Sequence, residues 1–275
     1  MNQFNGSLWS LFQSLPRNYT LIARMTRREV AARYRGSIIG LAWSFVNPVL
    51  LLFVYTFVFT IVFKARWGES QFGVVNDGGF AIMIFAGMIV HSLFSECFIR
   101  SPGLITGNAN FVKRVVFPLE VLSWVAIGSA AFHAAVSLLV LLVGQLLLMG
   151  SIPSTAILVP LVYLPLMILT LGLSWFVSAS GVYFRDLSQV SGFISTVLMF
   201  LSPVFYPLSS IPESYRWAFY LNPLTFIIEA SRGLLLFGQL PSAPGLAVYY
   251  AVSLGVAWLG FAWFQKTRRG FADVL

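Results

Sequence analysis

Long uncharged apolar runs constrain the fold of this chain more than any other feature of its sequence. The clearest run extends from Ser37 to Phe63 without a charged side chain. A helix needs roughly 20 mostly apolar residues to cross the hydrocarbon core of a bilayer. The complete set of such runs lies near residues 38–63, 80–99, 121–149, 155–180, 188–206 and 246–265. We therefore expect an all-α polytopic membrane protein with six transmembrane helices.

Composition supports a membrane protein and excludes several other classes. Only 9% of the 275 residues are charged and 58% are hydrophobic, with a mean hydropathy of +0.85. A soluble domain is usually about 25% charged, so a soluble globular protein, a disordered chain and an ordinary nucleic-acid binder are excluded. The runs lack the alternation of β-barrel strands. The single cysteine, Cys97, leaves no intrachain disulfide and no cysteine-based metal site.

Basic residues predict the orientation in the membrane, because cytoplasmic loops carry an excess of Lys and Arg. With the N-terminus inside and six crossings, 13 of the 17 basic residues fall on the inner side. The other four, on the outer side, are Lys64, Arg66, Arg216 and Arg232. We therefore expect both termini in the cytoplasm.

The segment 17–36, before the first run, has the pattern of an amphipathic interface helix. At 100° per residue, four of its arginines fall within about 40° of one another, and Gly36 is a plausible stop. These arginines are Arg17, Arg24, Arg28 and Arg35. Such a helix lies in the headgroup plane, with its arginines toward anionic lipid or a cytoplasmic partner. The alternative is a positive-inside anchor with no further role.

Residues 207–238 do not form a simple span, because Asn222-Pro223 interrupts the apolar sequence. A single span here would bury Glu229 and Arg232 and would place the basic C-terminus outside. Two short re-entrant half-helices that dip in from the outer face fit better. Non-helical backbone at membrane depth is tolerated only against protein or water, so this region is expected to line or cap a pathway.

Catalytic and ATP-binding motifs are absent from the sequence. The nearest match to a phosphate-binding loop is Gly260 with Lys266-Thr267, but Gln265 replaces its second glycine. We find no nucleophile triad, metal cluster or paired catalytic carboxylates. The chain is therefore interpreted as a non-enzyme, and energy from ATP would have to come from another chain.

Ion-coupled carriers usually have ionisable residues near the middle of the membrane, and three residues within the apolar runs are candidates for such a role. They are His91, Glu96 and His133. Glu96 is poorly placed to pair with His91, and its spacing from Arg100 predicts an i,i+4 ion pair. His133 is interpreted as a packing residue. This pattern disfavours a channel or ion-coupled carrier that works without an ATPase.

Five sequence segments, each occurring once, follow one another along the chain in the order typical of one protein family. They are RREVAARYRGSIIGLAWSFVNPVL (27–50), GNANFVKRVVFPLEVL (107–122), YFRDLSQV (183–190), the stretch from SPVFYP through LNPLTFIIEASR (202–232) and FADVL (271–275). Together they resemble the membrane permease subunit of type-2 ABC polysaccharide exporters. This is the family of O-antigen, capsule and teichoic-acid export permeases, and the O-antigen type is favoured.

The resemblance implies a half-transporter in the bacterial inner membrane that pairs with itself as a homodimer and with two copies of a nucleotide-binding subunit. The partner would bind ATP and Mg, and this chain would hold no cofactor and no metal. The substrate implied is a polysaccharide linked to undecaprenyl pyrophosphate, such as O-antigen. The alternative is a type-2 permease for another lipid, a drug, or a capsule or teichoic polymer.

Two inner loops are assigned to ATPase coupling by the resemblance. The loop between spans two and three resembles a coupling helix, with Asn110, Phe111, Lys113 and Arg114 as its contact residues; the alternative is a basic loop that anchors the span ends. Arg185 and Asp186 would contact the ATPase or cap span five.

Arg24, Arg28 and Arg35 are assigned to the lipid headgroup or pyrophosphate, since clustered guanidinium groups bind such oxyanions.

Two further sets of residues are assigned to the transport path. The outer gate comprises Pro203, Pro207, Asn222, Pro223, Glu229 and Arg232. Pro203 and Pro207 should break span five. Glu229 and Arg232 have the i,i+3 spacing of an ion pair. Aromatic rings pack on the C–H faces of sugars but also face lipid. The channel-lining candidates are Trp43, Phe53, Tyr55, Phe59, Phe193, Phe200 and Tyr206.

Overall fold

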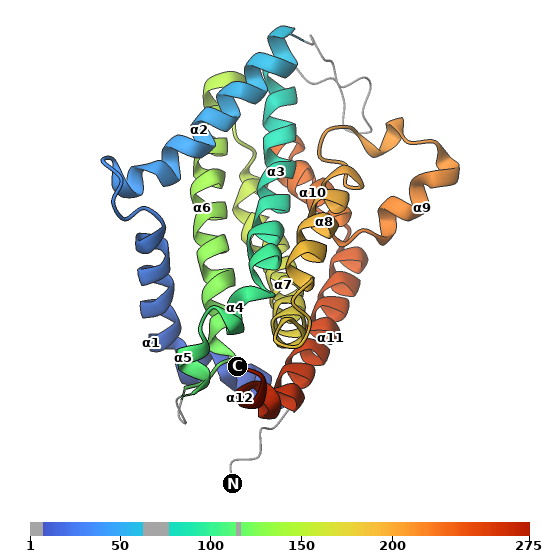
Figure 1. Cartoon of the computed structure of the whole chain (residues 1–275). Coiled ribbons are helices and arrows are strands. Elements are labelled where there is room, and N and C mark those ends of the chain that lie inside the picture. The colour runs from blue at the N-terminus through green and yellow to red at the C-terminus, as the bar shows by residue number, and fades with distance from the viewer. Residues whose placement is uncertain (1–7, 63–76, 114–116) are drawn as a thin grey trace.

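The computed structural model describes residues 8–62, 77–113 and 117–275, and in these ranges the chain forms helices and turns without a strand (Figure 1). The all-α prediction is therefore confirmed. Five helical stretches are long and apolar enough to cross a membrane: Gly40–Phe59, Gly79–Arg100, Val121–Met149, Ser154–Gly181 and Ala243–Val274. They coincide with five of the six predicted spans. The last residue of the first predicted span, Phe63, lies outside the described residues.

The long stretches consist of the following elements. They are η1 (Gly40–Ala42), α2 (Trp43–Tyr55) and the π-helix η2 (Thr56–Val62); α3 (Asp77–Arg100); α6 (Val121–Met149); η3 (Ser154–Leu158) and α7 (Val159–Gly181); and α11 (Ala243–Thr267), η6 (Arg268–Gly270) and α12 (Phe271–Val274). The remaining elements are α1 (Leu8–Arg33), α4 (Gly103–Thr106), α5 (Ala109–Val112), α8 (Leu187–Phe200), η4 (Leu208–Ser210), α9 (Glu213–Leu221), α10 (Pro223–Arg232) and η5 (Gly233–Phe237).

The predicted span at 188–206 differs from the others. Its helix, α8, has 14 residues and ends at Phe200, whereas a helix of that length rises only about 21 Å against a hydrocarbon core of about 30 Å. The residue before a proline is disfavoured in the helical conformation, and Ser202 precedes Pro203. The chain therefore turns at 201–206, and a single continuous helix over 188–206 does not form.

Helix α3 lies at the centre of the bundle and packs on α6, α7, α8 and α10. Most of its side chains are buried, whereas most of the large apolar side chains of α2 are exposed. Figure 1 shows α2 slanting away from α6 at its first residues and approaching α3 at its far end. The described part of α2 therefore presents a broad apolar face to its surroundings.

Helix α1 begins at Leu8, before the predicted start at residue 17, and continues through Pro16. It ends at Arg33, and Gly36 follows with a φ of 86°, a left-handed conformation that favours glycine. The apolar side chains Ile22 and Val30 are buried, and α1 packs mainly on α6 (Figure 1). The buried apolar side chains of α1 thus contact a neighbouring helix.

Glycines allow α7 and α11 to pack backbone against backbone. A Cβ at Gly260 would overlap the carbonyl oxygen of Gly172, and a Cβ at Gly172 would meet the backbone of Ala257. Small residues at such contacts let helices approach closely and gain van der Waals contact in a membrane. The position of α11 against the bundle therefore depends on these glycines.

We expect Gly260→Ala to destabilise the protein and Gly255→Ala to leave its stability unchanged or slightly raised. Both glycines lie in α11, so the gain in helix propensity is similar, but a Cβ at Gly255 meets nothing within 4 Å. Overpacking costs about 1–3 kcal/mol. The apparent melting temperature of purified protein in detergent measures the difference, and equal values for the two variants would contradict the packing argument.

Candidate functional site

The loop after α3 carries the predicted coupling residues at one end of the bundle. Figure 1 shows α4 and α5 at the same end as α12 and the C-terminus. Asn110 and Lys113 are exposed there, while the ring of Phe111 stacks on that of Phe117 with centroids 4.4 Å apart. Arg114 lies outside the described residues. The loop therefore presents polar side chains around an aromatic pair that holds its shape.

The turn between α7 and α8 lies beside the start of this loop. A Cβ at Gly181, the last residue of α7, would overlap the backbone of Pro102, so the two segments are in contact. Arg185 and Asp186 are both exposed in the turn. Asp186 occupies the N-cap position of α8, but its side chain makes no capping hydrogen bond.

The three arginines assigned to a headgroup or pyrophosphate are all exposed. Arg24 and Arg28 are exposed on α1, and Arg35 is exposed in the turn that follows it. The opposite side of α1 is occupied by Ile22, which packs with Val121 and Val125 of α6. Arg24 and Arg28 therefore project away from the helix that α1 packs on.

Two ion pairs connect α1 to α3. Glu96 and Arg100 each pair with a residue of α1, so the prediction that they pair with each other is wrong. Arg33 Nη2 donates to Glu96 Oε1 at 2.7 Å, and Arg100 pairs with Glu29. An i,i+4 pair on one helix contributes only about 0.2–0.5 kcal/mol, so partners on a packed neighbouring helix readily displace it. Sequence reasoning missed these contacts because nothing in a local spacing shows which helices will meet.

His133 of α6 joins the same cluster. Its Nδ1 lies 3.0 Å from both carboxylate oxygens of Glu96, and its Nε2 lies 3.1 Å from the hydroxyl of Tyr34. Partial burial raises the pKa of Tyr34 above its usual value, an effect opposed by Arg33. The hydroxyl therefore stays protonated near neutral pH and is able to donate to the imidazole. His133 was predicted only to pack. It instead bonds to Arg33 of α1, to Tyr34 in the turn after α1 and to Glu96 of α3.

Five of the seven aromatic candidates form two groups. Tyr55 and Phe59 pack on α3, with centroids 6.5 Å from Phe85 and 5.5 Å from Phe80, respectively. The second group is exposed on the surface of the chain. Its members are Phe53, Phe193 and Phe200.

The two remaining aromatic candidates make polar contacts within the chain. Trp43 donates its indole N–H to Ser37 at 2.9 Å. The hydroxyl of Tyr206 donates to the carbonyl of Phe200, and its ring meets that of Phe219 edge to face with centroids 6.1 Å apart. Both side chains are half-buried.

Arg232 forms a buried clamp in the predicted outer gate. Its side chain is 1% exposed, and its Nη1 donates to Glu229 at 3.0 Å, which confirms the predicted pairing. Its Nε and Nη2 donate to the carbonyls of Met83 and Val204 at 3.1 and 2.7 Å. One guanidinium thus connects α10 with α3 and with the turn after α8.

Asn222 makes a second connection to the broken end of α8. Its side-chain amide donates to Leu201 O at 3.0 Å and to Ser202 Oγ at 2.8 Å. Its side-chain oxygen accepts from Leu224 N at 2.9 Å and caps α10, with Pro223 at the first position of that helix. Pro203 is buried and Pro207 half-buried in the turns between these elements.

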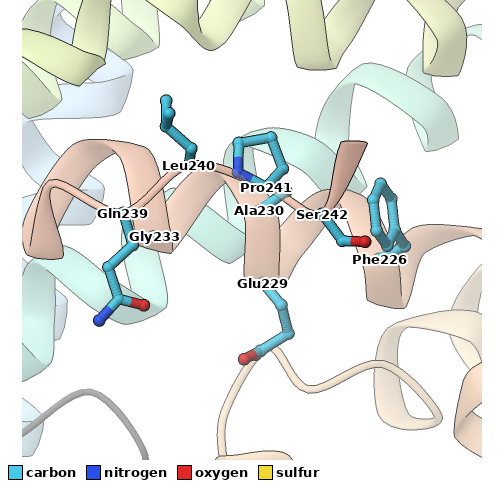
Figure 2. Close-up of a pocket in the computed structure, with 8 residues that line it drawn as sticks. All are labelled: Phe226, Glu229, Ala230, Gly233, Gln239, Leu240, Pro241 and Ser242. Carbon is cyan, nitrogen blue, oxygen red and sulfur yellow. The ribbon is translucent and has the colours of Figure 1, made fainter. Parts of the chain in front are cut away.

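A pocket of about 210 Å³ lies where α10 meets the segment before α11. Figure 2 shows Glu229, Gln239 and Phe226 among the side chains that line it. The ring of Phe226 also stacks on Tyr249 at 5.8 Å. The pocket is small, and Glu229, the partner of Arg232, is one of the residues that line it. Within the described residues, no group of His, Cys, Asp and Glu is arranged to hold a metal.

Comparison with known proteins defines the class of this protein. Residues 20–236 match the family described as ABC-2 type transporter, and the chain therefore belongs to that family. It is a permease, the transport component of such a system, and it spans the membrane several times.

Its relatives include named polysaccharide export proteins. The O-antigen export system permease protein RfbA of Myxococcus xanthus is 30% identical over 92% of this chain and 94% of its own length. The polysialic acid transport protein KpsM of Escherichia coli is 25% identical over 86% and 90%. The capsule polysaccharide export inner-membrane protein CtrC of Neisseria meningitidis serogroup B is 24% identical over 81% and 82%.

We expect Arg232→Met to lower the apparent melting temperature by about 6 °C or more, because removing one partner of a buried ion pair costs about 3–5 kcal/mol. Arg216→Met is the matched control. Arg216 pairs with Glu213, whose side chain is 90% exposed, and such a surface pair contributes about 0–1 kcal/mol. Thermal unfolding in detergent compares the two, and a larger loss for Arg216→Met would contradict the clamp.

Proposed function

We propose that this chain is the permease half of an ABC exporter that moves a polysaccharide linked to undecaprenyl pyrophosphate, such as O-antigen, across the inner membrane. The observation that carries the proposal is the similarity to RfbA of Myxococcus xanthus over 92% of the chain. A match of that extent includes most of the transport domain rather than one short motif. The inner-membrane location is supported by CtrC, whose name states it.

A separate nucleotide-binding subunit would bind ATP and Mg and hydrolyse the nucleotide, with two copies serving two permeases. Membership of the ABC-2 family supports such a partner. The loop of α4 and α5 is its docking site in this proposal. Exposed Asn110 and Lys113 supply polar contacts, and Phe111 braces the loop from within. The exposed pair Arg185 and Asp186 extends the same surface.

A homodimer would cover much of the exposed apolar face of α2. Phe45, Val49 and Phe53 on this helix are each about half exposed or more, and a second copy or lipid must contact them. Exposed Phe53, Phe193 and Phe200 are then the aromatic residues best placed to meet a sugar chain between two copies. Tyr55 and Phe59 serve instead to hold α2 against α3 within each copy.

The sixth crossing and the gate are assigned to the region from α8 to α10. In this proposal α8 and the turn after it cross most of the membrane, and α9 and α10 form re-entrant half-helices on the outer side, so that both termini lie in the cytoplasm. The Arg232 and Asn222 contacts support this assignment, because they satisfy carbonyls that the break in α8 leaves without helical donors.

We expect a strain that lacks this chain to accumulate the polymer inside the cell. Lipid-linked polysaccharide made in the cytoplasm would have no route outward, so a polymer-specific antibody should label cells only after permeabilisation. Re-expression of the chain should restore surface labelling. Antibodies against O-antigen and against capsule, used in parallel, identify the polymer, and loss of capsule alone would favour the capsule alternative that KpsM and CtrC represent. Normal surface levels of both polymers would refute the proposal.

The three exposed arginines on and after α1 are proposed to hold the pyrophosphate of the carrier lipid. Hydrogen bonds to charged groups contribute about 1.5–3 kcal/mol each, so replacing Arg24, Arg28 and Arg35 together with Gln should reduce export about tenfold or more. The control replaces three other exposed basic residues, Arg27, Lys266 and Arg269, with Gln. Both variants are compared at equal membrane levels, and normal export by the first variant would rule out this role.

A further inference from the structure

The ion pairs between α1 and α3 are crossed in a way that fixes the register of the two helices. Glu29 and Arg33 are four residues apart on α1, and Glu96 and Arg100 are four apart on α3. The earlier residue of α1 pairs with the later one of α3, and the later with the earlier. Residues four apart share one face of a helix, so both pairs form together at a single antiparallel register.

Sliding α1 by one turn in either direction would bring like charges together. In one direction Glu29 would come opposite Glu96, and in the other Arg33 would come opposite Arg100. Like charges on neighbouring turns destabilise the contact, and here they would meet on partly buried surfaces. The pattern therefore opposes sliding as well as separation, which a single ion pair would not do.

Contacts with α6 hold the same end of α1 from a second side. His133 bonds to Glu96 and to Tyr34, and a Cβ at Gly128 would lie 2.9 Å from Thr26 Oγ1. The absence of a side chain at Gly128 thus lets α1 pack closely on α6. In this region α1 is attached to both helices by polar groups and by packing.

We infer that α1 and α3 move as one rigid lever, with Glu29, Arg33, Glu96 and Arg100 as the positioning residues that join them. Helix α3 continues through Ser101 and Pro102 into the loop proposed to dock the ATPase, and α1 is joined to α2 by the short turn at 34–39 and η1. A displacement of that loop is therefore delivered through the crossed pairs to α2. This inference rests on the proposed function, since it concerns ATP-driven export.

A covalent link in place of one pair tests the lever. In a Cys97→Ala background, the chain with its ATPase partner carries Glu29→Cys and Arg100→Cys. A bifunctional methanethiosulfonate reagent joins the two cysteines through one disulfide at each end, with methanesulfinate as the leaving group, so that a reductant can cleave the link. Both positions are about one-third exposed and open to reagent. We expect export to fall in the unlinked double variant and to return to the level of the Cys97→Ala parent after linking. Loss of export on linking, reversed by a reductant, would show that the helices separate in each cycle and would overturn the lever.

Charge reversal supplies a readout that a purely structural role would not change. We expect Glu29→Arg alone to keep ATP hydrolysis within about twofold while export falls about tenfold, because the ATPase still turns over but its motion no longer reaches α2. The double variant E29R/R100E restores the pair with exchanged charges and should recover export. Reversal of both residues of α1, E29R/R33E, is the control in which neither pair is complementary.

The outcomes separate this inference from the function on which it rests. If the Cys97→Ala parent neither exports polymer nor hydrolyses ATP with its partner, the proposed function fails. If the parent exports normally, but ATP hydrolysis and export fall in parallel with protein level in every variant and linking restores nothing, then the pairs only stabilise the fold and the lever is refuted.

Discussion

Many of the buried polar side chains of the bundle bond to other parts of the chain, because hydrocarbon offers no hydrogen bonds; the hydroxyls of Ser129 and Ser253 are exceptions, buried without a partner among the described residues. Several hydroxyl side chains bond to carbonyls one turn earlier, as Thr170 of α7 does to Leu166 and Ser101, just after α3, does to Cys97. Where a polar side chain reaches further, it joins two segments: Gln145 of α6 donates to Leu235 O at 2.6 Å. Such interhelical bonds contribute about 0.6–2 kcal/mol, and with the close α7–α11 contact they hold together a bundle that gains little from a hydrophobic effect between its helices.

The same requirement explains the polar residues of α10 and of the residue before it, Asn222. Once α8 stops before Pro203, carbonyls such as those of Leu201 and Val204 lose the donors that a continuing helix would supply. Asn222 and Arg232 provide donors to these two carbonyls, and Glu229 balances the charge that Arg232 brings. The break in α8 and the buried ion pair are therefore two parts of one arrangement, and neither is readily stable at this depth without the other.

The length of an apolar run predicts a spanning helix well, because both are set by bilayer thickness; α6 has the bounds that its run predicted, Val121 to Met149. Glu229 and Arg232 were also predictable, since they pair within one helix. The partner of Glu96 was not, because its choice among Arg100, Arg33 and His133 depends on which helices meet. The apolar run at 188–206 overstated α8 because hydropathy continues across Ser202-Pro203, where the backbone does not. The family resemblance, rather than spacing, supplied the coupling loop.

Helix α2 depends on α3 at both of its ends. At the beginning, α1 ties it to Glu96 and Arg100, and at the far end Tyr55 and Phe59 pack on Phe85 and Phe80. These two attachment points on α3 are separated by roughly 11 to 20 residues, which is about 17–30 Å along a helix. Between them most large apolar side chains of α2 remain exposed. A tilt of α3 therefore moves α2 at both ends together, and the exposed face of α2 follows the central helix as a unit.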